Sequence, residues 1–441
     1  MSTRFQLFVQ PPSSDPGARP EVVTVSSPAG SVAPGPADHR MYVVEPIGKE
    51  KPFGRVRGPF GTPYVYLPPW GGAARAPAMP DAEGHFDHLA PGMPGFEAAH
   101  LFGAVRFTLD VWERYLGGPF HWHFAGHIER LEISLLHHWD NAQYGFGFLE
   151  TGSQFEDDGT VQPFSLNFDV VAHEIGHAII YSLIGVPDPR TELPEYLGFQ
   201  ESAADCVSII AAMHFPSVLR EVLEATRGNL YQFNRLARIS EYSRTRQMRL
   251  ANNSLTMARF ARGWDDEHDL AQPLTGAVFD ILVDIFHESL VAGGAISPAV
   301  EDLADRAEND PELRPVLQAE FDRAYERDPA GFLTALEDAR DLTGVFLADS
   351  FKRMEANYLD YDDLGNALLA IDMEENDGAF SRLIRRNFER RLIGTVDAGP
   401  RLKAPDKRSH TRSARTVLPD DQDALPGMSY RERYLLARSG R

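Results

Sequence analysis

The stretch VVAHEIGHAII, residues 170–180, carries two histidines and a glutamate in the middle of an otherwise apolar run. The apolar spacing predicts a buried helix, and three polar side chains within five positions of such a helix need partners. His173 and His177 would lie on one face of that helix, one turn apart, where both imidazoles can reach a single zinc ion at about 2.0–2.1 Å. The competing interpretation is that they bond to other side chains, because a chain with 15 histidines can contain this spacing by chance.

The glutamate of this stretch has the position of a catalytic base. Glu174 follows His173 directly, so we expect its carboxylate beside the open coordination position of the metal and not on the metal. There it can accept a proton from a zinc-bound water, whose pKa the metal lowers to about 7. A second His-Glu pair, His287 and Glu288, has no histidine four positions after His287, and it indicates a solvated helix face.

A catalytic zinc site needs a third protein ligand, which we expect in GFQESAADCVSII, residues 198–210. Glu201 follows His177 by 24 residues, 201 − 177, which leaves room for a helix end, a loop and the start of a second helix. Asp205 lies four residues after Glu201 on the same helix face, where it can accept the N–H of a ligating histidine and fix its tautomer. The apolar residues around these carboxylates predict a largely buried helix, and buried carboxylates need partners. The two histidines and three acidic residues together predict one catalytic zinc ion.

The composition is that of a globular protein. The chain has 441 residues, of which 43% are apolar and 10% aromatic, enough for two or three domains. The net charge of −21 argues against nucleic-acid binding and against adhesion to an anionic membrane surface. A single cysteine, Cys206, excludes an intrachain disulfide and a cysteine-based metal site. No stretch approaches the roughly 20 apolar residues that span a bilayer, and the N-terminus lacks the apolar core of a signal peptide. We therefore expect a cytoplasmic protein, unless a non-standard export route operates.

Changes in composition divide the chain into four parts. Residues 1–95 form an irregular, Pro/Gly-rich region with short strands, in which residues 11–40 read as a flexible or irregular leader. Residues 96–180 alternate helix and strand patterns and end in the helix that carries HEIGH. Residues 181–393 are almost entirely helix-patterned, and residues 394–441 form a basic tail, expected to be mobile. The expected fold class is α+β.

At these residues the chain resembles the thermolysin-like gluzincin zinc metallopeptidases. FDVVAHEIGHAI is similar to the active-site helix of the family, with His173 and His177 as zinc ligands and Glu174 as catalytic base. ESAAD is similar to the helix of the third ligand, with Glu201 on zinc and Asp205 behind it. The resemblance implies a two-lobed fold, with a mixed α/β N-terminal lobe, a mainly helical C-terminal lobe and the zinc site in the cleft between them.

Two further segments extend the resemblance from about residue 96 to about residue 290. HHWDNAQY is similar to the edge strand of the family that pairs with bound peptide, which implies a substrate-binding role for Asn141 and Ala142. DDEHDLAQPLTGAVFDIL is similar to the segment that supplies an oxyanion-stabilising histidine, here His268. Either Asp265 or Asp266 would orient that imidazole.

The chain also departs from the family pattern. The gap between His177 and the third ligand is a few residues longer than usual, so the oxyanion tyrosine does not align; Tyr196 is the first candidate and Tyr181 the second. The substrate-binding arginine of the family corresponds to Arg235 or Arg238.

A structural calcium ion is not expected. Asp169 lies where the family has a calcium ligand, but its partner acidic position is Ala212. The large propeptide and the secretory leader typical of the family are also missing from the sequence.

The leading hypothesis is a zinc endopeptidase that hydrolyses internal peptide bonds with a zinc-bound water activated by Glu174. Its partner would be a peptide or protein substrate; the sequence indicates no oligomeric state. One alternative is a zinc aminopeptidase, which needs acidic residues that grip a free N-terminus, and no such signature precedes HEIGH. The other alternative is a non-catalytic binding protein that retains the fold, which the presence of base and ligands together disfavours.

Overall fold

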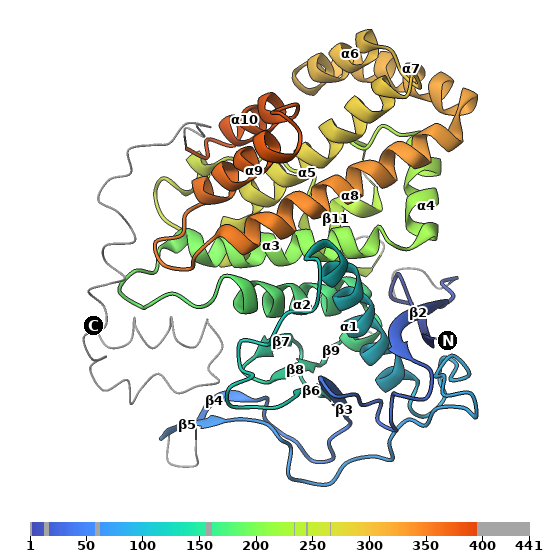
Figure 1. Ribbon diagram of the computed structural model, residues 1–441, viewed down its shortest axis with the longest axis vertical. Helices are drawn as coiled ribbons and strands as arrows, with labels where there is room; N and C mark the ends of the chain where they lie inside the picture. Colours follow the sequence, from blue (N-terminus) through green and yellow to red (C-terminus); the bar gives the residue numbers. More distant parts are fainter. Residues whose placement is uncertain are drawn as a thin grey trace.

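A four-stranded sheet lies in the N-terminal half of the protein (Figure 1). Its strand order is β3-β6-β8-β7, with bounds Met41–Val44, Leu131–Leu135, Phe148–Thr151 and Ala142–Gly145. β3 and β8 run parallel to β6, whereas β7 runs antiparallel to β8 and is an edge strand. The mixed α/β character expected from the sequence is therefore present. The computed structural model describes residues 2–12, 17–57, 62–155, 161–232, 234–243, 246–264 and 266–394.

The two faces of this sheet differ in character. Ile133 and Leu149 are paired across β6 and β8, are fully buried and belong to the main hydrophobic core. Glu132 and Glu150 point to the opposite face and are also fully buried. The chain between β3 and the first helix covers this polar face, where Lys49 forms a 2.5 Å ion pair with Glu150. That segment includes the hairpin of β4 (Gly54–Arg57) and β5 (Pro63–Tyr66).

The N-terminal residues form part of the folded core. β1 (Ser2–Leu7) and β2 (Glu21–Pro28) pair antiparallel and pack on helix α1 (Phe96–Tyr115). Phe5 is fully buried, and Gly103 of α1 makes room for it, because a Cβ at Gly103 would lie 2.9 Å from Phe5. Part of the expected leader is thus a strand, and β3 joins the central sheet.

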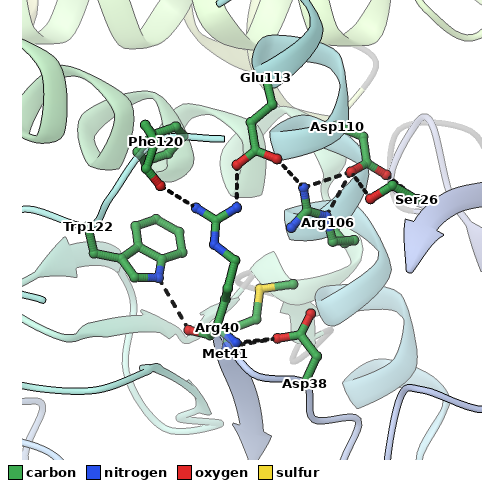
Figure 2. Close-up of polar contacts among 9 residues, drawn as sticks. All are labelled: Ser26, Asp38, Arg40, Met41, Arg106, Asp110, Glu113, Phe120 and Trp122. Atoms are coloured by element: carbon green, nitrogen blue, oxygen red, sulfur yellow. Dashed lines mark hydrogen bonds and ion pairs between the residues drawn. The ribbon is translucent and has the colours of Figure 1, made fainter. Parts of the chain in front are cut away.

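A polar network ties this N-terminal part to α1 (Figure 2). The Arg40 guanidinium pairs with Glu113 of α1 and donates a 2.9 Å hydrogen bond to the Phe120 carbonyl. Arg106 pairs with Glu113 and with Asp110, at 2.6 and 2.7 Å. Because Ser26 of β2 also donates to Asp110, the network joins β2, β3, α1 and the loop after α1.

Helices make up most of the chain after the sheet (Figure 1). The central ones pack in succession, α2 on α3, α3 on α5 and α5 on α8. Their bounds are Phe168–Leu183, Pro194–Ala212, Glu267–Ala292 and Pro329–Arg353. Around them lie α4 (Pro216–Thr226), α6 (Pro298–Asn309), α7 (Arg314–Arg327), α9 (Tyr361–Glu375) and α10 (Ser381–Arg390). The remaining described strands form the pairs β9 (Ser153–Phe155) with β10 (Val161–Pro163) and β11 (Arg238–Ser243) with β12 (Arg246–Leu250).

The close contact of α2 with α3 has a local cause. A Cβ at Gly176 would lie 2.6 Å from the Cα of Ala204, so glycine and alanine allow the two backbones to approach. Asn167 caps α2 by accepting the backbone N–H groups of Asp169 and Val170. Pro194 in the first turn of α3 suits a position where no helical N–H is needed. These features set the relative position of the two helices that carry the predicted ligands.

Two further expectations concern the C-terminal tail and the absence of a membrane-spanning segment. The predicted C-terminal tail, apart from Gly394, lies outside the described residues. Within residues 2–394 as described, no single helix has the length and apolarity to cross a membrane. Only α3 and α4 together, which meet at a 94° bend, reach that threshold by length and composition.

Candidate metal centre

The three predicted ligands meet between α2 and α3. The Nε2 atoms of His173 and His177 lie 3.1 Å apart. The Glu201 carboxylate faces both, with Oε2 3.3 Å from Nε2 of His173 and Oε1 3.6 Å from Nε2 of His177. One donor atom from each residue falls within 4.8 Å of the others. Among the described residues, this group is the one arranged to hold a metal ion.

The outer nitrogens of both rings have partners that define the tautomer. Nδ1 of His173 lies 2.9 Å from Oδ1 of Asp205, which is fully buried. Nδ1 of His177 faces Oε1 of Gln200 at 3.5 Å. Burial lowers the pKa of His177 to about 4, so this ring is neutral near pH 7. Protons placed on Nδ1 of both rings leave both Nε2 atoms as lone-pair donors.

This arrangement fits a bound cation. Two lone pairs that face each other across 3.1 Å repel unless a positive charge lies between them. Two nitrogens held tetrahedrally at about 2.0–2.1 Å from one zinc ion would be about 3.3 Å apart, close to that value. The buried Oε2 atom of Glu201 meets the geometry of no hydrogen bond, and it faces the Nε2 atoms of His268 and His173 at 3.2 and 3.3 Å. Burial opposes ionisation of Glu201, but His268, His177 and His173 hold the pKa of this carboxyl well below its usual range.

Glu174 lies beside the cluster, as expected for a base. Its side chain is buried, and burial raises its pKa to about 7, with His173 acting in the opposite direction. The backbone N–H of Tyr144, in edge strand β7, donates to the Glu174 carboxylate. A carboxyl group with a pKa near 7 is suited to accept and release a proton at neutral pH.

His268 reaches the same cluster from the first turn of α5. Its Nε2 atom lies 3.2 Å from Oε2 of Glu201, and its Nδ1 atom lies 2.8 Å from Oδ1 of Asp266. Asp266 also caps α5 by accepting the His268 backbone N–H at 2.8 Å. The same aspartate therefore begins the helix and orients the imidazole. Asp265, the other candidate for this role, lies outside the described residues.

The predicted peptide-binding residues, Asn141 and Ala142, lie at the start of edge strand β7. The Asn141 carbonyl accepts the N–H of Gly152, so the alternation of an antiparallel pair points the backbone groups of Ala142 and Tyr144 away from β8. The Tyr144 N–H, which points away from β8, donates to Glu174. Ala142 presents its N–H and C=O in the same direction, whereas Asn141 is exposed at the start of the strand.

Tyr196 does not have the predicted role as an oxyanion donor. It is fully buried, and its hydroxyl donates to the Gly185 carbonyl at 2.7 Å. It also accepts a 2.7 Å hydrogen bond from Nε2 of Gln200. Gln200 in turn faces His177, so Tyr196 supports this candidate ligand through Gln200. Gln200 is the site residue that the sequence analysis missed; its position next to Glu201 is the signal that points to it.

The contacts of the two candidate substrate-binding arginines and of the second His-Glu pair are as follows. Arg235 pairs with Glu221 and bonds to the Val9 carbonyl, which ties it to the N-terminal segment. Arg238 begins β11, a strand that contacts α2 and α3. The expected solvated face of the second His-Glu pair is wrong for His287, which is buried against aromatic rings; Glu288 is exposed.

No known family model matches this chain, and no curated protein is significantly similar to it in sequence.

Proposed function

We propose that the protein is a zinc-dependent metallopeptidase of the thermolysin-like gluzincin type, which hydrolyses internal peptide bonds. The observation that carries the proposal is the convergence of the Nε2 atoms of His173 and His177, 3.1 Å apart, on the carboxylate of Glu201. A buried carboxyl group with a pKa of about 7, that of Glu174, and a third imidazole, that of His268, lie next to that cluster. The placement of the cluster between the sheet-containing half and the helical half supports a two-lobed organisation.

Each side chain in or beside the cluster has a proposed role that follows from its position. His173, His177 and Glu201 would hold zinc, which supplies Lewis acidity and lowers the pKa of a water. Glu174 takes a proton from the attacking water and delivers it to the nitrogen of the leaving amine. His268 donates a hydrogen bond to the oxyanion that develops on the carbonyl oxygen as the water oxygen bonds to the carbonyl carbon.

The outer edge of strand β7 can position a bound peptide. The outward N–H and C=O groups of Ala142 can pair with the main chain of an extended peptide, as in strand addition to a sheet edge. Since Tyr144 on the same strand bonds to Glu174, a peptide bound there lies alongside the base. Main-chain pairing of this kind favours an internal segment of a peptide over a free amino acid derivative.

The test compares two substrates and two variants. The purified protein is analysed for metal, then assayed with an internally quenched peptide and with an aminoacyl fluorophore. We expect one zinc per chain, cleavage of the quenched peptide, loss of activity with a chelator and recovery with zinc. Cleavage of the fluorophore alone would identify an aminopeptidase, and a zinc-loaded protein that cleaves neither would be a binding protein.

The variants separate chemistry from folding. Glu174→Gln keeps the shape of the base but cannot take the proton, so it should retain zinc and peptide binding while losing most turnover. Glu288→Gln, an exposed acidic residue on α5, is the matched control and should behave as wild type. No bound metal after zinc-replete expression, or full activity in Glu174→Gln, would overturn the proposal.

A further inference from the structure

A polar cavity lies in the helical half of the molecule, apart from the candidate metal centre. Its volume is about 620 Å³, and none of the cluster residues lines it. The walls come from the loops after α4 and β12 and from α5, α6, α7 and α10. In Figure 1 these helices lie on the side of α3 away from the sheet. Six separate parts of the chain therefore enclose a space that the proposed peptidase reaction does not use.

A buried ion pair lines one side of this cavity. Arg391 and Asp280 are 4% and 3% exposed and are joined at 2.6 Å. Arg391 also donates to Oδ1 of Asn253 at 3.0 Å and to the Leu255 carbonyl at 3.1 Å. Gly276 of α5 makes room for the guanidinium, since a Cβ there would lie 2.7 Å from the Cζ atom of Arg391. This wall is built from buried polar groups that are held by one another.

The charge around the cavity is opposite to that of the chain as a whole. Among its described lining residues are three arginines, Arg314, Arg390 and Arg391, against one acidic residue, Asp280. The complete chain carries a net charge of −21, so arginines gathered at one cavity mark a local preference for anions. Arginine is the side chain best suited to bind carboxylate or phosphate groups, through two parallel N–H donors.

Amide side chains form the rest of the polar lining. Asn229, which is 5% exposed, donates to Gln318, but its Oδ1 atom has no hydrogen-bond partner within the described residues. Gln232 and Asn252 add further amides to the lining, and Ser254 adds a hydroxyl. A buried acceptor without a partner is costly, and a ligand or water with a donor group would satisfy it.

From these features we propose that the cavity binds a small organic anion. The ligand would carry a carboxylate or phosphate group for Arg314 and Arg390 and a hydroxyl or amino group for the neutral amides. The site does not depend on the proposed peptidase activity, because it shares no residue with the metal centre. Since the walls belong to α5, α7 and α10, binding should also stabilise the packing of these helices.

The test is isothermal titration of the full-length protein with three probes: L-malate, inorganic phosphate and glycerol. We expect saturable binding of malate or phosphate with one site per chain, and no binding of neutral glycerol. Binding of malate alone or of phosphate alone would each support the site and identify the group that the arginines recognise. Saturable binding of neither anion would overturn the proposal.

Variants locate the binding. Arg314→Gln and Arg390→Gln change exposed side chains and leave the buried Arg391–Asp280 pair in place. Each should weaken anion binding about tenfold or more, and the double variant should abolish it. Arg382→Gln, on an exposed position of α10, is the matched control. Anion binding that persists in the double variant occurs elsewhere, for example at the metal centre, and would overturn the proposal.

Discussion

The two candidate ligand histidines have orienting partners of different charge. His173 faces the carboxylate of Asp205, whereas His177 faces the neutral amide of Gln200. A carboxylate makes the imidazole a stronger donor as well as fixing its orientation, and an amide mainly fixes the orientation. The amide is itself held by the Tyr196 hydroxyl, so the His177 ring depends on a chain of two neutral hydrogen bonds.

We expect Gln200→Leu to weaken zinc binding about 10- to 100-fold, because His177 loses the acceptor that selects its tautomer. Competition with a chromophoric chelator measures the affinity. Gln200→Glu, which keeps an acceptor at the same distance, should restore most of it. Equal affinities for wild type and Gln200→Leu would show that packing alone orients the ring.

Replacement of His268 should affect turnover and leave zinc binding unchanged. It contacts Glu201 and is held by Asp266, but it is not in the metal-ligand group. His268→Ala should lower kcat about 10²–10³-fold, the typical cost of losing an oxyanion donor, with little change in KM and none in zinc content. Steady-state kinetics with the quenched peptide, beside metal analysis, measures all three. A variant with wild-type kcat would show that His268 takes no part in the reaction.

Edge strand β7 is positioned from both sides. On the side of the helices, the Tyr144 N–H bonds to Glu174. On the polar face of the sheet, the Gln143 side chain donates to Oε2 of Glu150 at 2.8 Å and to the Phe53 carbonyl at 3.0 Å. Glu150 is in turn paired with buried Lys49, so the covering segment and the edge strand share one network.

Lys49→Met should destabilise the protein by about 3–5 kcal/mol, because it leaves the Glu150 carboxylate buried without its countercharge. Lys49 and Glu150 are 1% and 0% exposed, so solvent cannot replace the lost partner. Chemical denaturation gives the free energy of unfolding. The double variant Lys49→Met/Glu150→Gln removes both charges and should recover much of the loss. A single variant within about 0.5 kcal/mol of wild type would mean that water reaches the pair.

The elements that local patterns could predict are the helices of the site. The apolar period of residues 168–183 and the spacing of His173, His177 and Glu201 needed no long-range information, and the structure brings the three together. The place of β3 in the sheet was harder to predict from the sequence, because β3 pairs with β6 some ninety residues later. Only that contact places the N-terminal segment in the sheet. The hydroxyl partner of Tyr196 depends on a loop carbonyl, which no periodic pattern reveals.

On the scale of the whole molecule, two histidines outside the candidate metal centre, His100 and His214, have a lowered pKa in the folded protein. His100 is fully buried in α1, and its Nε2 atom accepts the Phe8 backbone N–H at 2.9 Å. Burial lowers the pKa of His100 from 6.5 to about 4. Burial similarly lowers the pKa of His214 to about 3. Both side chains are therefore neutral in the folded protein near pH 5–7, and below about pH 6.5 they take up protons on unfolding.

These histidines predict lability in acid. Their pKa is depressed in the folded state, so their contribution to stability is complete above pH 6.5 and is lost as the pH falls toward 4. His100 alone should lower the free energy of unfolding by about 2 kcal/mol between pH 7 and pH 5. His100→Gln should flatten that loss in denaturation curves, while exposed His121→Gln should not. An unchanged slope in His100→Gln would assign the acid sensitivity to other groups.

The order of the site residues along the chain has a consequence for biosynthesis. The two histidines of α2 are made first, then Glu201, and His268 follows His177 by 91 residues, 268 − 177. At roughly 5–20 residues per second, this interval is about 5–18 s, during which a nascent chain carries the imidazole pair, and for most of that time Glu201 as well, without His268. A free metal ion could bind such a chain before α3 and α5 have packed. The complete cluster with His268, by contrast, can form only once the start of α5 has been made, so under the proposed function the growing chain would carry no complete peptidase site before residue 268.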